Sequence, residues 1–251
     1  MQLDNTSAIV TGAASGLGAA TAAKLAASGA RVFGLDLESA IAEASQIAGL
    51  SYVATDVTNA EQVRAAVAQA AEAGPLRTAV NCAGIGPSAR ILGRKGVHDL
   101  DLFAKIVTIN LVGTFTVTAL AAEAIAQTAE LEHGQRGVII NTASIAAFDG
   151  QIGQVAYAAS KGGVVGMTLP AARDLAQFGI RVNTIAPGII ETPMLATVSE
   201  EVRATLAAGV PFPHRLGQPG EYAQLVSMLI EHDYLNGETI RMDGALRMAP
   251  R

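Results

Sequence analysis

The sequence predicts an α/β fold in which a doubly wound parallel sheet lies between two layers of helices. Short apolar runs rich in Val and Ile alternate with alanine-rich stretches of helical periodicity, and parallel strands need helical crossovers of this kind. The chain has 251 residues, half of them apolar, which is enough for one domain of this class. We therefore expect a single three-layer domain over 1–251.

Seven runs have the length and composition of strands. In order they are 7–11 (SAIVT), 31–35 (RVFGL), 51–56 (SYVATD), 77–81 (RTAVN), 138–144 (VIINTAS), 181–186 (RVNTIA) and 238–242 (ETIRM). Each run contains β-branched or other apolar residues, as buried strands of a parallel sheet do.

Helical periodicity fills most of the intervals between these strands. The predicted helices are 16–28, 38–48, 59–73, 99–130, 155–178 and 220–231. Two turn-rich segments, 84–99 and 187–219, instead follow the carboxyl ends of predicted strands, where open α/β sheets bind their ligands. We expect these two segments to be the substrate loops.

The composition excludes several classes of protein and partner. Only 16% of the residues are charged, and a net charge of −5 lacks the basic surface that nucleic acid or an anionic membrane requires. Cys82 is the only cysteine and the four histidines are scattered, so neither a disulfide nor a metal site is expected. The apolar runs are interrupted and no leader pattern precedes the first strand. We expect a cytoplasmic protein without a membrane span.

A glycine-rich turn, TGAASGLG at 11–18, joins the first strand to the first helix. Glycines at 12, 16 and 18 allow a tight turn and a close approach of the backbone to a pyrophosphate, and the helix N-terminus offers N–H groups to its charge. An ordinary strand-to-helix turn is the alternative, but the flanking strand and helix favour nucleotide binding. The turn therefore predicts a Rossmann-type dinucleotide-binding fold, with the spacing GxxxGxG.

Asp36 follows the second strand, 18 residues after Gly18. An acidic residue at this place hydrogen-bonds the adenosine ribose hydroxyls and repels a 2′-phosphate. The glycine turn and position 37 supply no Arg or Lys for such a phosphate. Asp36 therefore predicts NAD rather than NADP, with capping of the next helix as the alternative.

Tyr157 and Lys161 lie four residues apart in a helical pattern, so they share one helix face. A phenol with a pKa of about 10 is a poor base at neutral pH, and a nearby ammonium favours the phenolate. A pair at this spacing is by itself usually a solvated helix face. Because Ser144 ends a predicted strand 13 residues earlier, we predict a proton-transfer site in which Lys161 activates Tyr157.

These motifs resemble, in order along the whole chain, the signature set of the short-chain dehydrogenase/reductase family: TGxxxGxG at 11–18, NCAG at 81–84, Asn110, Ser144, Tyr157-x-x-x-Lys161 and Pro187-Gly188. The resemblance implies that Tyr157 is the general acid/base, that Ser144 hydrogen-bonds the substrate oxygen, and that Lys161 also binds the nicotinamide ribose. It implies that Asn110 holds the water of a proton relay. A helix-interior Asn bonded to backbone is the alternative for Asn110.

The resemblance also implies an NAD site along the carboxyl edge of the sheet. Asp56 and Val57 are expected at the adenine, 81–84 along the cofactor, and Ile189 with Thr192 at the carboxamide. The full set of expected cofactor-binding residues is Gly12, Ser15, Gly16, Leu17, Gly18, Asp36, Asp56, Val57, Asn81, Ala83, Gly84, Tyr157, Lys161, Pro187, Gly188, Ile189 and Thr192.

Within that family, the runs at 134–148, 150–170, 210–217 and 236–248 resemble the type-2 3-hydroxyacyl-CoA dehydrogenases, also called 17-beta-hydroxysteroid dehydrogenases type 10. The resemblance implies NAD-dependent interconversion of 3-hydroxyacyl-CoA and 3-oxoacyl-CoA in fatty acid metabolism by a homotetramer. Ser144, Gln151, Gln154 and Tyr157 are the expected substrate-binding residues, with a solvated loop as the alternative for the two glutamines.

Several functional alternatives remain open. A 3-oxoacyl carrier-protein reductase and a hydroxysteroid or other secondary-alcohol dehydrogenase use the same catalytic groups, and an NAD-binding scaffold without catalysis is the third possibility. We expect Met194, Leu195, Val198 and Leu206 to cover an acyl chain, although ordinary packing explains them equally. Arg90, Arg94 and Lys95 are either contacts for the phosphates of coenzyme A or solvated charges.

Overall fold

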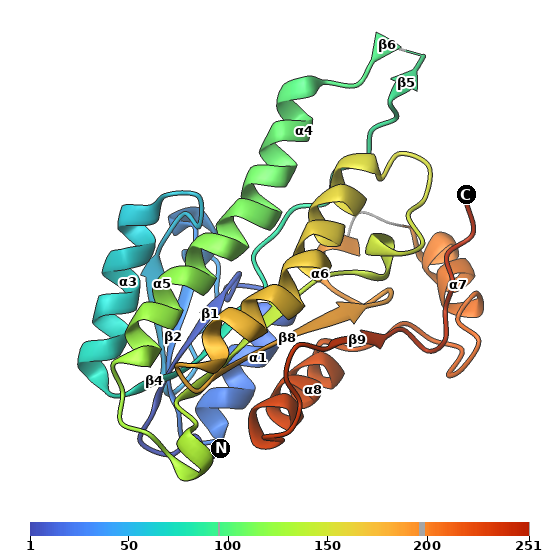
Figure 1. Ribbon diagram of the computed structural model, residues 1–251. Helices are drawn as coiled ribbons and strands as arrows, with labels where there is room; N and C mark the ends of the chain where they lie inside the picture. The colour runs from blue at the N-terminus through green and yellow to red at the C-terminus, as the bar shows by residue number, and fades with distance from the viewer. Residues whose placement is uncertain (95, 196–198, 251) are drawn as a thin grey trace.

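Seven parallel strands form one sheet at the centre of the molecule (Figure 1), in a computed structural model that describes residues 1–94, 96–195 and 199–250. The strand order is β3-β2-β1-β4-β7-β8-β9, and all neighbours are parallel. The bounds are β1 (Ser7–Thr11), β2 (Arg31–Asp36), β3 (Leu50–Ala54), β4 (Leu76–Asn81), β7 (Gly137–Thr142), β8 (Ile180–Pro187) and β9 (Thr239–Met242). The predicted Rossmann-type sheet of seven parallel strands is confirmed.

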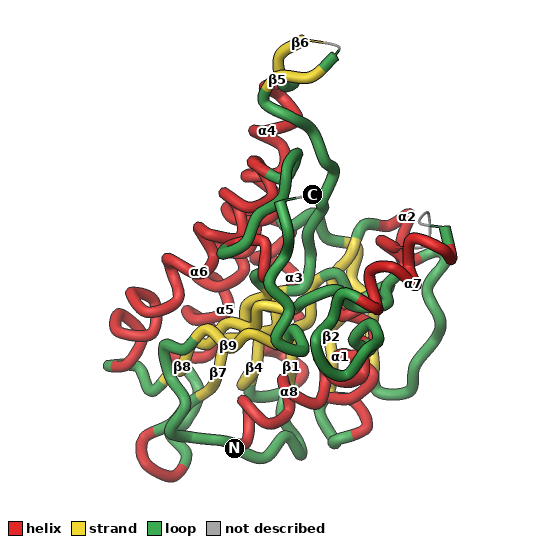
Figure 2. Tube along the Cα trace, turned by 90° about the vertical axis from the view of Figure 1, so that its right-hand side faces the viewer, coloured by secondary structure: helices red, strands yellow, loops and turns green. Residues whose placement is uncertain are grey.

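Helices cover both faces of the sheet, which gives the three expected layers (Figure 2). On one face, α1 (Gly16–Ala27) packs against α8 (Pro219–Glu231). On the other face lie α3 (Ala60–Ala73), α5 (Thr114–Ala126) and α6 (Val155–Ala176).

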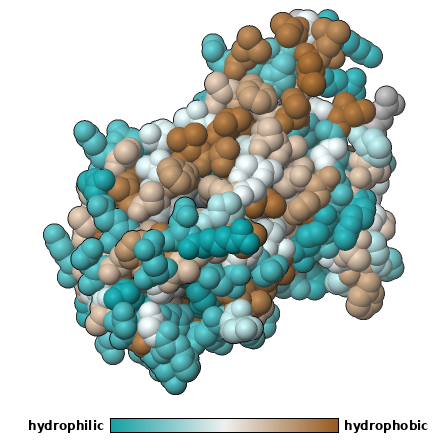
Figure 3. Space-filling view, viewed as in Figure 1, coloured by the Kyte–Doolittle hydropathy of each residue, from teal (hydrophilic) through white to brown (hydrophobic). Residues whose placement is uncertain are grey.

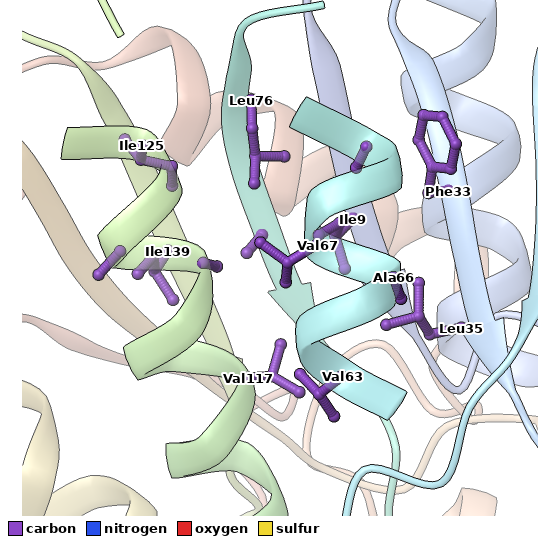
Figure 4. Close-up of a cluster of buried hydrophobic side chains, with 14 of the residues drawn as sticks. Ile9, Phe33, Leu35, Val63, Ala66, Val67, Leu76, Val117, Ile125 and Ile139 are labelled. Atoms are coloured by element: carbon purple, nitrogen blue, oxygen red, sulfur yellow. The ribbon is translucent and has the colours of Figure 1, made fainter. Parts of the chain in front are cut away.

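Alternate residues of the central strand β1 enter the two cores between these layers. Ile9 packs with Val67 and Val117, under α3 and α5 (Figure 4), whereas Ala8 and Val10 belong to the core under α1 and α8. All five residues of β1 are buried, because side chains of a strand point alternately to both faces and both faces are covered.

The strand order reverses beside β1. The chain continues from β1 to β2 and β3 on one side and then crosses to β4 on the other. Connections that leave neighbouring strands in opposite directions open a crevice at the carboxyl ends of those strands. The glycine turn at 11–18 and the segment 81–84 both follow strands at this point.

The segment 38–48 departs most from the predicted elements. α2 spans only Glu38–Ile41, and none of its residues is buried, so no packed apolar face stabilises a longer helix. β3 likewise ends at Ala54, which leaves Asp56 beyond the strand. β7 ends at Thr142, two residues before its predicted end at Ser144, so Ser144 lies beyond the strand.

The predicted helix 99–130 is interrupted. α4 (Leu100–Val107) passes into a π-helical turn (Thr108–Gly113) and then into α5, which ends at Ala126. The Thr128 hydroxyl donates to the Ile125 carbonyl at 2.7 Å just past this end. Asn110 lies in the π-helical turn, a feature that often marks a functional site.

The helical region Leu100–Ala126 is long and apolar enough, by length and composition, to cross a membrane. This is contrary to the expectation drawn from the interrupted apolar runs. A helix that packs on a protein core meets the same two criteria, and here α5 packs on α3 and β4 while α4 packs on α6.

Both predicted substrate loops contain short elements. The first carries a hairpin, β5 (Leu92–Gly93) and β6 (Gly96–Val97), which extends away from the sheet (Figure 1). The second contains a 3₁₀ turn (Pro193–Leu195) and α7 (Glu200–Ala208). Among the residues expected to cover an acyl chain, Leu206 lies on α7 and is half-buried, and Val198 lies outside the described residues.

Candidate active site

The glycine turn after β1 leaves no room for a side chain at Gly12 or Gly18. Gly12 and Gly16 have φ values of +66° and +52°, in the left-handed region that favours glycine. A Cβ atom on Gly18 would clash with the carbonyl oxygen of Gly12, and one on Gly12 would lie 2.9 Å from the nitrogen of Ala83. The backbone is therefore bare at the N-terminus of α1, and this cradle fits the pyrophosphate of a dinucleotide.

Asp36 ends β2 with its carboxylate at the glycine turn. Its Oδ2 accepts the backbone N–H of Ala14 at 2.9 Å, and its Oδ1 accepts that of Leu37 at 2.9 Å. α2 begins without a side-chain cap, so Asp36 does not cap it as the alternative interpretation required. A carboxylate accepts about four hydrogen bonds, which leaves capacity for ribose hydroxyls.

The segment after β4 lies against the same turn. The N–H of Ala83 donates to Thr11 Oγ1 at 3.1 Å, and a Cβ atom on Gly84 would lie 3.1 Å from Asn110 Oδ1. Thr192 reaches the turn from the other side, since its Cγ2 is 3.4 Å from where a Gly16 side chain would begin. These residues surround the predicted cofactor position.

Other residues expected at the cofactor direct their side chains elsewhere. The amide of Asn81 donates to Asn141 at 2.9 Å and to Thr118 at 3.2 Å inside the protein, and Val57 packs under the π-helical turn. Asp56 Oδ1 accepts the N–H and the hydroxyl of Thr58. Ser15 precedes the first residue of α1 without a side-chain capping bond, Leu17 packs against the core, and Pro187, Gly188 and Ile189 lie at or just past the end of β8.

Ser144, Tyr157 and Lys161 meet at the carboxyl end of β7. Tyr157 and Lys161 lie in the first turns of α6, with the Lys161 ammonium 5.9 Å from the centre of the Tyr157 ring. Ser144 forms a side-chain hydrogen bond with Tyr157. Lys161 is buried, and its Nζ donates to the Thr142 carbonyl at 2.7 Å. The structure thus brings the three predicted groups together.

Burial changes the ionisation of two of these groups. It raises the pKa of Tyr157, and the hydrogen bond with Ser144 acts in the opposite direction. Burial also lowers the pKa of Lys161 to about 8. Burial, which disfavours the phenolate, is therefore the larger influence on the pKa of Tyr157, and activation of Tyr157 by Lys161 stays a prediction.

Asn110 is fully buried and holds the segment that follows β4. Its Oδ1 accepts the N–H of Ile85 at 2.8 Å, while its Nδ2 donates to the Ile85 carbonyl at 2.9 Å and to Ser160 Oγ at 3.0 Å. These bonds tie the segment to α6. They agree with the alternative of an Asn bonded to backbone, and a role in a proton relay stays a prediction.

Gln151 and Gln154 use their side chains within the protein. The Gln151 amide donates to the Ala249 carbonyl at 2.8 Å, and Gln154 Oε1 accepts the N–H of Gln151 at 2.9 Å. The N–H of Ile152 donates to the Pro250 carbonyl at 3.1 Å. The C-terminal segment therefore holds the loop before α6, and a contact of either Gln with substrate stays a prediction.

An open pocket of about 390 Å³ lies between the segments 89–92 and 150–155. The two segments are joined by a hydrogen bond of 2.8 Å from the Ala89 N–H to the Gly153 carbonyl. The lining residues include Ile91, Leu92, Ile152, Val155 and Ala158, together with Arg90. An apolar chain with a negatively charged end suits such a pocket.

Three buried hydroxyl residues near the catalytic groups were not predicted from the sequence. Thr142 holds Lys161 through its carbonyl, Ser160 links Asn110 to the Tyr157 carbonyl, and Tyr222 bonds to Thr142. The available signal was weak: each is a polar residue within an apolar strand or helix pattern. Among the described residues, no group of three His, Cys, Asp or Glu side chains is arranged to hold a metal ion.

Residues 6–203 match the family model of the short chain dehydrogenases. The chain belongs to this family. Short-chain dehydrogenases are oxidoreductases that use NAD or NADP, so this chain is an oxidoreductase, and the family confirms the resemblance seen in the motifs.

Two relatives of this short-chain dehydrogenase carry the same description. This chain is 52% identical over 250 residues to human 3-hydroxyacyl-CoA dehydrogenase type-2, and the aligned region covers 97% of this chain and 95% of the human protein. It is 45% identical to 3-hydroxyacyl-CoA dehydrogenase type-2 from Mycobacterium avium, whose crystal structure superposes with a TM-score of 0.92 over 98% of both chains. The 3-oxoacyl-[acyl-carrier protein] reductase from Brucella melitensis is less similar, with 30% identity and a TM-score of 0.86 over 98% of this chain and 92% of that one.

Proposed function

We propose that this short-chain dehydrogenase interconverts 3-hydroxyacyl-CoA and 3-oxoacyl-CoA with NAD. The observation that carries the proposal is the meeting of Ser144, Tyr157 and Lys161 near the glycine cradle, in a chain 52% identical to a relative with this activity in its name. The apolar pocket beside α6 gives room for the acyl part of the thioester.

The chain's own residues supply binding and proton transfer. When bound, NAD supplies the acceptor for the hydride. Tyr157 Oη takes the proton of the substrate hydroxyl group, and Ser144 Oγ donates a hydrogen bond to the same oxygen. The Lys161 ammonium has three N–H donors and uses one on Thr142, which leaves two for the ribose and for the side of Tyr157.

The proposal is tested by NADH formation with a panel of alcohols. The panel contains 3-hydroxyacyl-CoA thioesters, the same acyl groups on a carrier protein, hydroxysteroids and simple secondary alcohols. We expect the highest kcat/KM with a CoA thioester. A higher value for a carrier-protein thioester or a steroid would replace the proposed substrate, and no turnover on any member would favour a non-catalytic NAD-binding protein.

The choice of NAD rests on Asp36. Its carboxylate is held at the glycine turn by the N–H groups of Ala14 and Leu37, so its negative charge lies where a 2′-phosphate of NADP would approach. A charge-assisted hydrogen bond contributes about 1.5 to 3 kcal/mol, which corresponds to roughly 10- to 150-fold in affinity.

Asp36→Ala is expected to lower the ratio of kcat/KM with NAD to kcat/KM with NADP by roughly 10- to 100-fold, because it removes an acceptor and a repulsive charge. Both values are measured with one thioester. The matched control is Glu38→Ala, which removes an exposed carboxylate two residues away and leaves the ratio unchanged. An unchanged ratio in Asp36→Ala would mean that Asp36 only orders the glycine turn.

The basic residues of the first loop extend the proposal to coenzyme A. Arg90 lines the apolar pocket, and Arg94 is exposed on the adjacent hairpin, while Lys95 lies outside the described residues. Guanidinium groups bind phosphates through paired hydrogen bonds. We therefore propose that Arg90 and Arg94 bind the phosphates of the ADP part of coenzyme A.

Arg90→Ala combined with Arg94→Ala is expected to raise KM severalfold for acetoacetyl-CoA and to leave KM for its N-acetylcysteamine thioester unchanged, because the short thioester lacks the phosphates. The difference in KM for acetoacetyl-CoA between the wild-type protein and the double variant shrinks as the salt concentration is raised, because salt screens the charges. The control removes two exposed charges elsewhere, Lys24→Ala with Arg64→Ala. Equal changes for both substrates contradict a phosphate contact.

We propose in addition a homotetrameric, cytoplasmic enzyme of fatty acid metabolism. Exposed apolar side chains gather along α4 and α5 (Figure 3), among them Phe103, Val112 and Phe115, and Phe115 is 59% exposed. A symmetric contact between copies of the chain would cover such a face. The single cysteine, Cys82, suits a reducing compartment.

A further inference from the structure

A closed ring of three hydrogen bonds lies beside the catalytic lysine, formed by Cys82, Thr142 and Tyr222. Thr142 Oγ1 donates to Cys82 Sγ at 3.6 Å, Cys82 Sγ donates to the Tyr222 hydroxyl at 3.7 Å, and the hydroxyls of Tyr222 and Thr142 are 2.6 Å apart. Each group donates one proton and also accepts, so Tyr222 closes the ring by donating to Thr142. Hydrogen bonds linked in this way strengthen one another.

The ring joins three segments that are distant in the sequence. Cys82 follows β4, Thr142 ends β7, and Tyr222 lies on α8, on the face of the sheet opposite α6. Tyr222 is fully buried and Thr142 is 5% exposed, and burial raises the pKa of both Cys82 and Tyr222. Cys82 is half-buried, whereas the bond between the Tyr222 and Thr142 hydroxyls is shielded, so water does not replace that bond when it is lost.

Thr142 connects the ring to Lys161. Its backbone carbonyl accepts the hydrogen bond from Lys161 Nζ at 2.7 Å. The ladder between β4 and β7 ends one residue earlier, at Asn81 opposite Asn141, so pairing with β4 does not reach this peptide. On its other side this peptide is held by β8, where the Ala143 N–H donates to the Ile185 carbonyl at 2.8 Å, so the Thr142 side chain, held by the ring, is the anchor on the side of β4.

We infer that Tyr222 is a positioning residue for the reaction: its hydroxyl, acting through Thr142, fixes the carbonyl that holds the Lys161 ammonium beside Tyr157. The inference rests on the proposed function of Lys161 and assigns a role to a side chain of α8 that touches neither substrate nor cofactor. Removal of the Tyr222 hydroxyl leaves the Thr142 side chain with only its longer bond to Cys82, and the bond that the ammonium donates to the Thr142 carbonyl weakens.

Tyr222→Phe tests this inference because it removes one oxygen and keeps the packed ring. We expect kcat to fall roughly tenfold with little change in KM for the thioester. We also expect the pKa of Lys161 to fall by about one unit, since the lost bond favoured the charged form. The pKa is measured by NMR on ¹³C-labelled lysine; the chain has four lysines, and the Lys161 signal is the one absent from Lys161→Met.

Thr168→Val is the matched control. Thr168 lies on α6, and its hydroxyl is 2.6 Å from that of Thr184 in an equally buried pair that does not touch Lys161. The control loses thermal stability to a similar extent but keeps the wild-type kcat and Lys161 pKa. Thr142→Val reproduces the effect of Tyr222→Phe, whereas Thr142→Ser keeps a hydroxyl in the ring and restores most of the activity.

Two outcomes would overturn the inference. One is a Tyr222→Phe protein that loses stability with unchanged kcat and unchanged Lys161 pKa, and the other is an equal change of both quantities in Thr168→Val. The lysine titration uses no substrate, so its result stands even where the wild-type protein fails to oxidise CoA thioesters. Failure of the proposed function and failure of this inference are therefore distinguishable.

Discussion

Tyr157→Phe is expected to lower kcat about a thousandfold while NAD still binds. A positioned acid or base accelerates a proton-transfer step by about 10²- to 10⁴-fold. The phenol of Tyr157 is the group that is hydrogen-bonded to Ser144, just past the end of β7. The substitution keeps the ring on α6, so the helix and the neighbouring Lys161 stay in place. The measurements are NADH formation with the preferred thioester and NAD binding by calorimetry.

Tyr234→Phe is the control for this prediction, because that phenol is 96% exposed and its removal leaves kcat unchanged. Loss of NAD binding in step with turnover would contradict the assigned role, since Tyr157 would then be a binding group. A fall of only a few fold would require another base, and the buried Lys161 would be the next group to test.

The sequence predicts the parts of the fold that depend on local pattern. All seven strands are predicted from apolar runs of five to seven residues. The pattern is clearest in β1, β4, β7 and β8, which are buried at every position and so have no polar side. Tyr157 and Lys161 share a helix face by their spacing alone, and Asp36 is placed at the glycine turn because it ends the strand next to β1. Local periodicity therefore fixes both the sheet and the core of the candidate site.

Features that depend on tertiary contacts were not predictable in this way. α2 is short because none of its residues is buried, and the π-helical turn around Asn110 shows no distinct periodicity. Gln151 donates a hydrogen bond to the carbonyl of Ala249, 98 residues away, and no local pattern predicts that bond. The ring of Cys82, Thr142 and Tyr222 spans 140 residues of sequence, and no spacing rule reaches that far.

The pKa values of the catalytic pair show the same limit. From the sequence, an ammonium four residues from a phenol should favour the phenolate. In the structure both groups are buried, and burial is the largest influence on each, raising the pKa of Tyr157 and lowering that of Lys161 to about 8. The depth of a side chain is set by the whole fold, so the sign of the shift followed from the structure only.

Lys161→Met is expected to lower kcat/KM by at least about a hundredfold and yet to stabilise the protein without cofactor. Lys161 is 4% exposed, and burial lowers its pKa from 10.5 to about 8, which corresponds to about 3 kcal/mol of destabilisation at neutral pH. Met is also long and unbranched, so it fills the same space without charge. The loss of the bond to Thr142 offsets part of the gain, and the free energy of unfolding is measured in urea.

The pH dependence of this difference isolates the buried ammonium. The pKa of Lys161 is lower in the folded protein than in the unfolded chain, so between pH 10.5 and 8 the unfolded chain binds a proton that the folded protein does not. The wild-type protein therefore loses stability as the pH falls through this range, and the full cost is present below about pH 8. From pH 7 to 9.5 the free energy of unfolding of the wild type should rise by roughly 2 kcal/mol relative to that of Lys161→Met.

Lys105→Met, which removes an exposed lysine of α4, is the control and should show no such change with pH. A difference in free energy of unfolding between wild type and Lys161→Met that stays constant with pH would mean that Lys161 is not a costly buried charge.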